Sequence, residues 1–139
     1  MKVNPMDKIC FTEMSLGKRS KSFNEIVAET KISDGDDKLL DTETAIIEII
    51  SLLKVGRSNG RSVYLVGNGG SAGVASHSVT DFINVAGLKA TTLHDPSLMT
   101  CMANDYGYES AFAKIISIVG QEGDILIAIS SSGQSKNIC

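Results

Sequence analysis

Two short loops of small polar residues carry the most distinctive chemistry in the sequence. The first is Gly67-Asn68-Gly69-Gly70-Ser71, and the second runs from Ser130 to Ser135. Glycines let backbone N–H groups approach a ligand closely, while serine and asparagine side chains add neutral hydrogen-bond donors. Such loops suit a phosphate monoester. Either loop alone could be a tight strand-to-helix turn, but two of them at equivalent strand ends favour a phosphate site.

Neither nucleotide-binding loop motif is present in the first of these segments. Its sequence, GNGGSA, lacks the G-x-G-x-x-G spacing of dinucleotide-binding folds, and no Gly-Lys-Ser/Thr follows it. We therefore expect no nucleotide cofactor.

His77 and Asp81 form a second candidate group. They stand four residues apart, so they share one face of a helix. A carboxylate beside an imidazole could transfer a proton, or the two could be metal ligands. The plainer alternative is a solvated surface pair. Because their face lies opposite the apolar stripe of the same helix, a closed site there would need another subunit.

A third polar segment contains Asn104 and Asp105, which we expect in a turn before a helix, where they could cap it or contact a sugar. His94-Asp95-Pro96 is expected to form a similar turn near a helix start.

Alternating helix and strand patterns position these residues. Apolar residues at helical spacing predict helices around 46–53, from Ser71 to about 83, and at 112–119. Apolar, β-branched runs predict strands at 62–66, 89–93 and 124–129, the first buried on both faces. This order predicts an α/β fold with a parallel sheet. Ligands of such sheets bind beyond the carboxyl ends of the strands, where both loops lie.

Composition limits the function further. The 139 residues carry a formal charge of −3, which argues against a protein that grips nucleic acid. The chain has three cysteines and neither a membrane-length apolar run nor a secretory signal, so we expect a cytoplasmic protein without a membrane span. We expect residues 1–39 to form an arm with one helix around 20–30 and a turn at SDGDD, and residues 40–139 to form the domain.

Three segments, VYLVGNGGSAGVASHSVTDF, CMANDYGYE and GDILIAISSSGQSKN, together resemble the SIS (sugar isomerase) domain. Within that family they look most similar to the phosphoheptose isomerases. The resemblance implies a flavodoxin-like, three-layer fold, assembled as a homotetramer. It also implies conversion of sedoheptulose 7-phosphate to D-glycero-D-manno-heptose 7-phosphate, an aldose–ketose isomerisation through an enediol.

The resemblance also assigns roles to residues. It implies that Ser130, Ser131, Ser132 and Ser135 bind the phosphate, and that sugar contacts come from Asn68, Gly69, Gly70, Ser71, Asn104 and Asp105. In many members the position of His77 binds zinc. The family uses a glutamate four residues later as base and metal ligand. Here that residue is Asp81, one methylene shorter, so the resemblance implies Asp81 as the base and His77 with Asp81 as zinc ligands.

Similarity to the family stops where this sequence stops, at Cys139. Family members continue with further strands and helices and with a Gln and a His of the site. We therefore expect a fold that is incomplete at its C-terminal side, a fragment or truncated product, or a chain completed by a partner.

Two functions other than the isomerase stay open. One is a non-catalytic module that binds a sugar phosphate and regulates a partner, as one relative does with a bacterial replication initiator; the other is an inactive remnant. The His77/Asp81 pair favours the isomerase.

Overall fold

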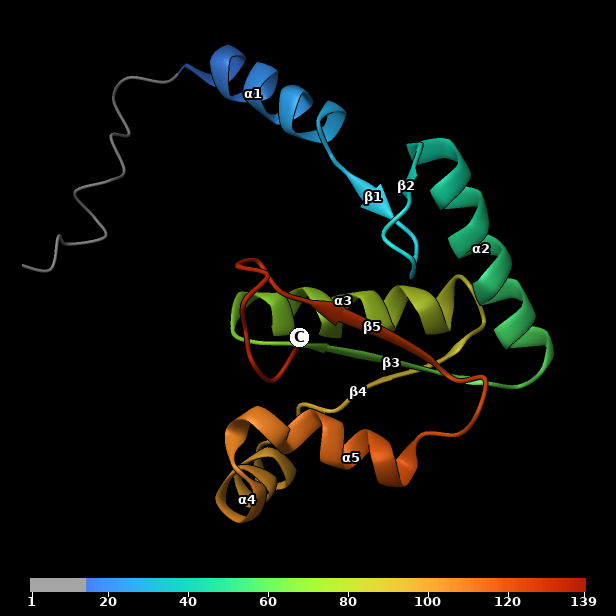
Figure 1. Cartoon of the computed structure of the whole chain (residues 1–139), viewed down its shortest axis with the longest axis vertical. Coiled ribbons are helices and arrows are strands. Elements are labelled where there is room, and N and C mark those ends of the chain that lie inside the picture. Colours follow the sequence, from blue (N-terminus) through green and yellow to red (C-terminus); the bar gives the residue numbers. More distant parts are fainter. Residues whose placement is uncertain (1–14) are drawn as a thin grey trace, which may run out of the picture. The chain divides into compact units, whose positions relative to one another are not determined.

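The computed structural model describes residues 15–139 of the chain, which form two compact units (Figure 1). The first extends to Glu48 and the second runs from Ile49 to Cys139. Cys10 lies outside the described residues. Among residues 15–139, no helix combines the length and the apolar character needed to cross a membrane.

The first unit contains a helix and a small hairpin. Helix α1 (Leu16–Ala28) begins at Ser15, whose hydroxyl accepts a hydrogen bond from the Lys18 amide, and this confirms the helix expected around residues 20–30. Strands β1 (Ile32–Ser33) and β2 (Leu39–Leu40) pair antiparallel around the expected SDGDD turn. Each strand has only two residues, too few for alternation to predict it.

The second unit is an α/β structure built on three parallel strands in the order β4-β3-β5. This confirms the expected parallel sheet. Helix α2 (Thr42–Ser58) begins in the first unit and ends in the second. The other elements are β3 (Ser62–Gly67), α3 (Gly70–Asn84), β4 (Lys89–Thr92), α4 (Pro96–Tyr106), the short 3-10 helix η2 (Tyr108–Ser110), α5 (Ala111–Val119) and β5 (Ile125–Ile129).

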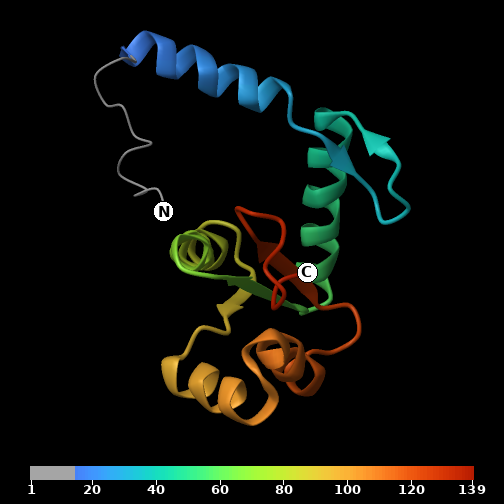
Figure 2. The same ribbon diagram turned by 60° about the vertical axis from the view of Figure 1, so that its left-hand side comes forward.

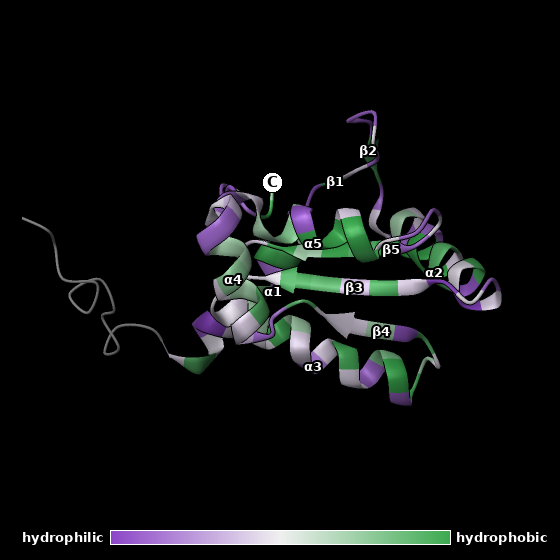
Figure 3. Cartoon of the chain, turned by 90° about the horizontal axis from the view of Figure 1, so that it is seen from below, coloured by the Kyte–Doolittle hydropathy of each residue, from purple (hydrophilic) through white to green (hydrophobic). Residues whose placement is uncertain are grey.

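Helices cover both faces of this sheet, as Figure 2 shows, so the second unit has three layers. Val63 and Leu65 of the central strand β3 pack with Ala75 of α3 on one face. Tyr64 and Val66 pack on the other, in a cluster that includes residues of α4 and α5. The apolar colour along β3 in Figure 3 reflects this double burial, which the continuous run of apolar residues predicts.

Helix α4 differs from the sequence expectation, which placed Asn104 and Asp105 in a turn. Both residues lie inside α4, near its C-terminal end. The helix begins as the His94-Asp95-Pro96 turn predicts: the Asp95 carboxylate accepts from the Leu98 amide at 2.8 Å, and Pro96 occupies the first turn. It continues because an apolar side formed by Leu98, Met99 and Met102 packs on the sheet. The sequence interpretation overlooked that side.

The predicted apolar stripes are only partly buried in the second unit. On α2, Leu53 is half-buried, while Ile49 and Ile50 are 53% and 44% exposed. On α3, Ala75 is fully buried, but Ile83 is 49% exposed. The periodicity therefore predicted both helices correctly and overstated how much of their apolar faces the described residues cover.

Asp124 joins the amino ends of β3 and β5. Its carboxylate accepts from the Ser62 amide at 2.8 Å and from the Gln121 amide at 2.9 Å, and these bonds, the Ser62 bond first, lower the pKa of Asp124 below its ordinary value of 3.8. A carboxyl whose pKa falls on folding stabilises the fold above its ordinary pKa, and this contribution is lost as the pH falls through the lowered value.

We expect Asp124→Ala to lower the melting temperature by a few degrees at pH 7, because two backbone donors lose their acceptor. The difference from the unchanged chain should shrink below about pH 3.8, where unfolded Asp124 is protonated. Thermal unfolding followed by circular dichroism between pH 2.5 and 7 checks this. Glu122→Gln, at a nearby exposed acid, is the matched control. Equal melting temperatures for the two variants at pH 7 would contradict the role of Asp124.

Candidate functional site

The carboxyl ends of the parallel strands bring the two predicted loops together. Gly67 at the end of β3 pairs in register with Ile129 at the end of β5, so the loops that follow are neighbours. The arrowheads of both strands point to the same side in Figure 1. The sequence prediction that both loops lie at one edge of the sheet is confirmed.

The glycine loop, residues 67–71, is shaped by close backbone approach. A Cβ on Gly67 would stand 2.8 Å from the Ser71 carbonyl carbon and 2.9 Å from its oxygen, so only glycine fits there. Gly69 adopts a φ of 52°, which favours glycine, and it precedes the first residue of α3. The N-terminal end of α3, with its positive dipole, therefore adjoins the loop, in a manner suited to an anion.

Asn68 links three segments of the chain through its side-chain amide. Its Oδ1 accepts from the Tyr108 hydroxyl at 2.8 Å and from Asn137 Nδ2 at 2.9 Å, and its Nδ2 donates to Asn137 Oδ1 at 2.8 Å. Sequence reasoning did not select Tyr108 or Asn137 as site residues. Both lie within the polar motifs that it did notice, so position in those motifs was the only available signal.

The serine loop, residues 130–135, folds back on its own hydroxyl groups. Ser130 Oγ donates to Ser135 Oγ at 3.3 Å, accepts from the Gly133 amide, and lies 3.5 Å from Ser132 Oγ. Ser132 Oγ also accepts from the Gln134 amide. Three hydroxyl groups thus converge, with Ser131 exposed between them. Hydroxyl groups can rotate to donate to an anion, so this cluster can reorganise around a phosphate.

Asn104 and Asp105 hydrogen-bond locally rather than to either loop. Asn104 Nδ2 donates to Asp105 Oδ1 at 3.0 Å, and the Cys101 thiol donates to the other Asp105 oxygen at 3.6 Å. The negative charge of Asp105 raises the pKa of Cys101. In this segment the residue that hydrogen-bonds to the glycine loop is Tyr108.

His77 and Asp81 lie elsewhere, on the exposed face of α3. His77 Nε2 is 3.8 Å from Asp81 Oδ2, and the two side chains are 81% and 62% exposed. The shared face that the spacing predicts is thus present. Counted from Gly70, the two residues lie about two and three helical turns along α3, away from the edge that carries the loops. One copy of the chain therefore does not gather this pair with the glycine and serine loops.

Zinc sites in proteins use three or four protein ligands. Within residues 15–139, no three His, Cys, Asp or Glu side chains are close enough to hold a metal together. The exposed His77/Asp81 pair supplies two, so the described residues of one copy do not fit a zinc site by themselves.

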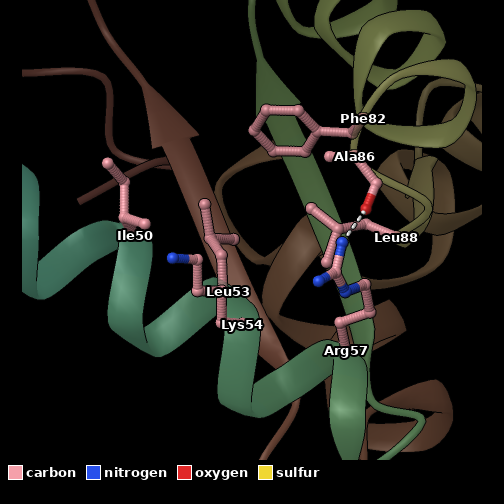
Figure 4. Close-up of a pocket in the computed structure, with 7 residues that line it drawn as sticks. All are labelled: Ile50, Leu53, Lys54, Arg57, Phe82, Ala86 and Leu88. Carbon is pink, nitrogen blue, oxygen red and sulfur yellow. Dashed lines mark hydrogen bonds between the residues drawn. The ribbon is translucent and has the colours of Figure 1, made fainter.

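An apolar hollow of about 210 Å³ lies at the opposite edge of the sheet, between the second half of α2 and the end of α3. Figure 4 shows Leu53, Phe82 and Leu88 around it and the Arg57 guanidinium donating to the Ala86 carbonyl at 2.8 Å. It contains none of the predicted site residues, so the candidate site remains the pair of loops.

Comparison with known proteins points to a single family. The family model for the SIS domain matches residues 23–139. Phosphoheptose isomerase 2 of Campylobacter jejuni is 36% identical over 123 residues, covering 83% of this chain and 58% of the relative. Phosphoheptose isomerase of Burkholderia pseudomallei is 40% identical over 111 residues, covering 74% and 54%. The chain thus spans a little more than half the length of these relatives.

Solved structures agree with the fold. A phosphoheptose isomerase from Francisella tularensis superposes with a TM-score of 0.67 and 28% identity, covering 90% of this chain and 66% of that one. Phosphoheptose isomerase GmhA from Neisseria gonorrhoeae gives a TM-score of 0.57 at 28% identity, covering 89% and 65%. With its parallel sheet between helices and its match over residues 23–139, the chain belongs to the SIS domain family.

Proposed function

We propose that this chain is part of a sugar-phosphate isomerase, with sedoheptulose 7-phosphate as substrate and D-glycero-D-manno-heptose 7-phosphate as product. The observation that carries the proposal is the junction of the glycine loop and the serine loop, which Asn68 and Asn137 join at the carboxyl edge of the sheet. The relatives named phosphoheptose isomerase support the choice of reaction and substrate.

In this proposal the loops hold the substrate by neutral donors. Ser130, Ser131, Ser132 and Ser135 bind the phosphate, and the first turn of α3 adds its positive dipole end. Asn68, Gly69, Gly70 and Ser71 contact the sugar. Asn104 and Asp105 contact its hydroxyl groups from the C-terminal end of α4.

The chemical step moves one proton between neighbouring carbons. Asp81 removes a proton from C1 of the ketose, the C2 carbonyl oxygen gains a proton as the enediol forms, and a proton returns to C2 as the C1 hydroxyl becomes the aldehyde. His77, 3.8 Å from Asp81, supplies or accepts the proton at oxygen. Since this pair lies apart from the loops in one copy, the proposed site joins the loops of one copy to Asp81 of another, in a homotetramer.

The proposal also covers zinc binding and the cellular location of the protein. His77 and Asp81 would hold zinc only with ligands from outside the described residues of one copy, so the mechanism includes no zinc step. A cytoplasmic location is favoured by the odd number of cysteines.

The test is proton NMR of sedoheptulose 7-phosphate incubated with the 139-residue chain in D₂O, with and without added zinc. We expect new heptose signals and deuterium at C1 or C2, because the exchanged base returns a deuteron from solvent. Ser130→Ala is the matched variant, in which turnover should fall because the hydroxyl cluster loses its centre.

Two other results would mean that this chain by itself is not an isomerase. Line broadening of the sugar signals without turnover, from folded protein, would favour the sugar-phosphate-binding module. An unchanged spectrum would mean that the chain neither binds nor converts this sugar phosphate.

A further inference from the structure

His94 follows β4 and lies against the end of β3. The Gly67 amide donates to His94 Nε2 at 3.1 Å, and the imidazole meets the Phe112 ring edge-on, with the ring centroids 5.7 Å apart. A ring nitrogen that accepts a hydrogen bond carries no proton. The imidazole is therefore neutral, with its proton on Nδ1.

That Nδ1 is buried and has no hydrogen-bond partner within the described part of the chain. A buried donor without a partner destabilises a fold, and a phenyl ring in its place would pack on Phe112 without this cost. Unlike a hydrocarbon ring, the imidazole provides a hydrogen-bond acceptor, its Nε2.

The acceptor takes the place of a missing strand partner. Pairing between β3 and β4 ends at Leu65 and Thr92, whereas β3 continues to Gly67. His94 thus extends the hydrogen bonding of β3 on its β4 side by one bond, directly before Asn68.

We propose that His94 is a positioning residue for the candidate site: its neutral imidazole holds the Gly67 peptide so that Asn68 and the glycine loop keep their ligand-binding conformation. This rests on the proposed function of the loops. His94 does not itself contact the substrate.

The imidazolium form is incompatible with this arrangement. Once Nε2 carries a proton, it faces the Gly67 N–H and the bond must break. Burial lowers the pKa of His94 below its ordinary value of 6.5. A histidine with a lowered pKa stabilises the folded arrangement above about pH 6.5, and this contribution is lost as the pH falls toward the lowered value.

Other titratable and charged groups on the neighbouring elements either have partners of their own or are exposed. The Asp95 carboxylate accepts from Leu98, the Tyr64 hydroxyl donates to the Val119 carbonyl, and the Lys114 ammonium lies over the Tyr106 ring. Asp105 accepts from Asn104 and Cys101. Glu109, on η2, is exposed. None of these hydrogen bonds or ring contacts involves the His94 ring.

Two variants separate the acceptor from the ring. His94→Gln places an amide oxygen near the position of Nε2 but does not titrate, and His94→Phe keeps an aromatic ring against Phe112 without an acceptor. Hydrogen exchange of the Gly67 amide, measured by NMR between pH 5 and 7.5, reports the bond directly. Titration with sedoheptulose 7-phosphate at each pH reports affinity.

We expect His94→Phe to lose protection at Gly67 and about tenfold in affinity at pH 7.5, the effect of one lost hydrogen bond. In the unchanged chain, the protection of the Gly67 amide and the affinity for the sugar phosphate should both fall as the pH drops below 6.5 toward the lowered pKa of His94. The His94→Gln variant should keep the protection and the affinity at every pH. Unchanged Gly67 exchange in His94→Phe would overturn the proposal, as would a His94→Gln chain that still weakens with acid. Loss of protection with unaltered affinity would refute the link to Asn68.

The same measurements test the proposed function of the loops separately from the role of His94. If no variant binds the sugar phosphate, the assignment of the loops is wrong, and the Gly67 exchange data still decide whether His94 holds the strand end.

Discussion

Gly67→Ala should destabilise the second unit by about 1–3 kcal/mol and remove most of its affinity for a sugar phosphate. The added Cβ would stand 2.8 to 2.9 Å from the Ser71 carbonyl carbon, oxygen and Cβ, and two of these atoms are backbone. No rotamer change can relieve a contact with backbone, so the first turn of α3 must shift. This shift displaces Ser71, which makes the contact, and Asn68, which follows Gly67, together with the N-terminal end of α3.

Gly73→Ala is the control, because Gly73 lies inside α3 and a Cβ there meets no atom within 4 Å. Alanine in a helix is more stable than glycine by about 0.5–1 kcal/mol, so this variant should be slightly more stable than the unchanged chain. Urea unfolding and a phosphate-ester titration measure both effects. Similar stability and affinity in the two variants would mean that α3 adapts without cost and that the close approach at Gly67 has no role.

Hydrophobic patterns predicted most of the α/β core because they report burial directly. The run from Val63 to Val66 is apolar without alternation, and β3 is indeed buried on both faces. The same reasoning missed the β1–β2 hairpin, whose two-residue strands are too short to show a period. It also treated Asn104 and Asp105 as turn residues, because an Asn-Asp pair before a helix is an ordinary cap and turn signal. The cap at Asp95 and the packing of Leu98 instead extend a helix through them.

The candidate site, like the fold, could be predicted from the sequence only in part. The position of its loops could be predicted, since both loops directly follow a strand and the ligands of parallel sheets bind beyond the carboxyl ends of the strands. The links between the loops could not, because Asn68, Tyr108 and Asn137 are far apart in sequence and meet only when β3 and β5 pair. Burial of His94 against Phe112 depends on the same folding, so the sequence showed only a histidine in a turn.

Asp81→Asn should reduce turnover of sedoheptulose 7-phosphate by about 10²–10⁴-fold, the usual contribution of a general base, while phosphate binding is retained. Asparagine matches aspartate in shape but cannot take a proton from carbon. Because Asp81 is 62% exposed, its loss should change the unfolding free energy by no more than about 0.5 kcal/mol, so a fall in rate would not reflect unfolding.

Asp81→Glu sharpens the test of Asp81 as the base. It keeps the carboxylate and adds one methylene, which moves the base by about 1 Å, a displacement that can change a rate on the order of 10²-fold. The rate should therefore depend on the length of the side chain as well as on its charge: Asp81→Asn should be slowed by about 10²–10⁴-fold, and Asp81→Glu should remain active at an altered rate. Deuterium incorporation at C1, followed by NMR beside a thermal melt of each variant, measures both. If Asp81→Asn exchanges deuterium as fast as the unchanged chain, the proton is moved by another group and the exposed pair on α3 is a surface contact.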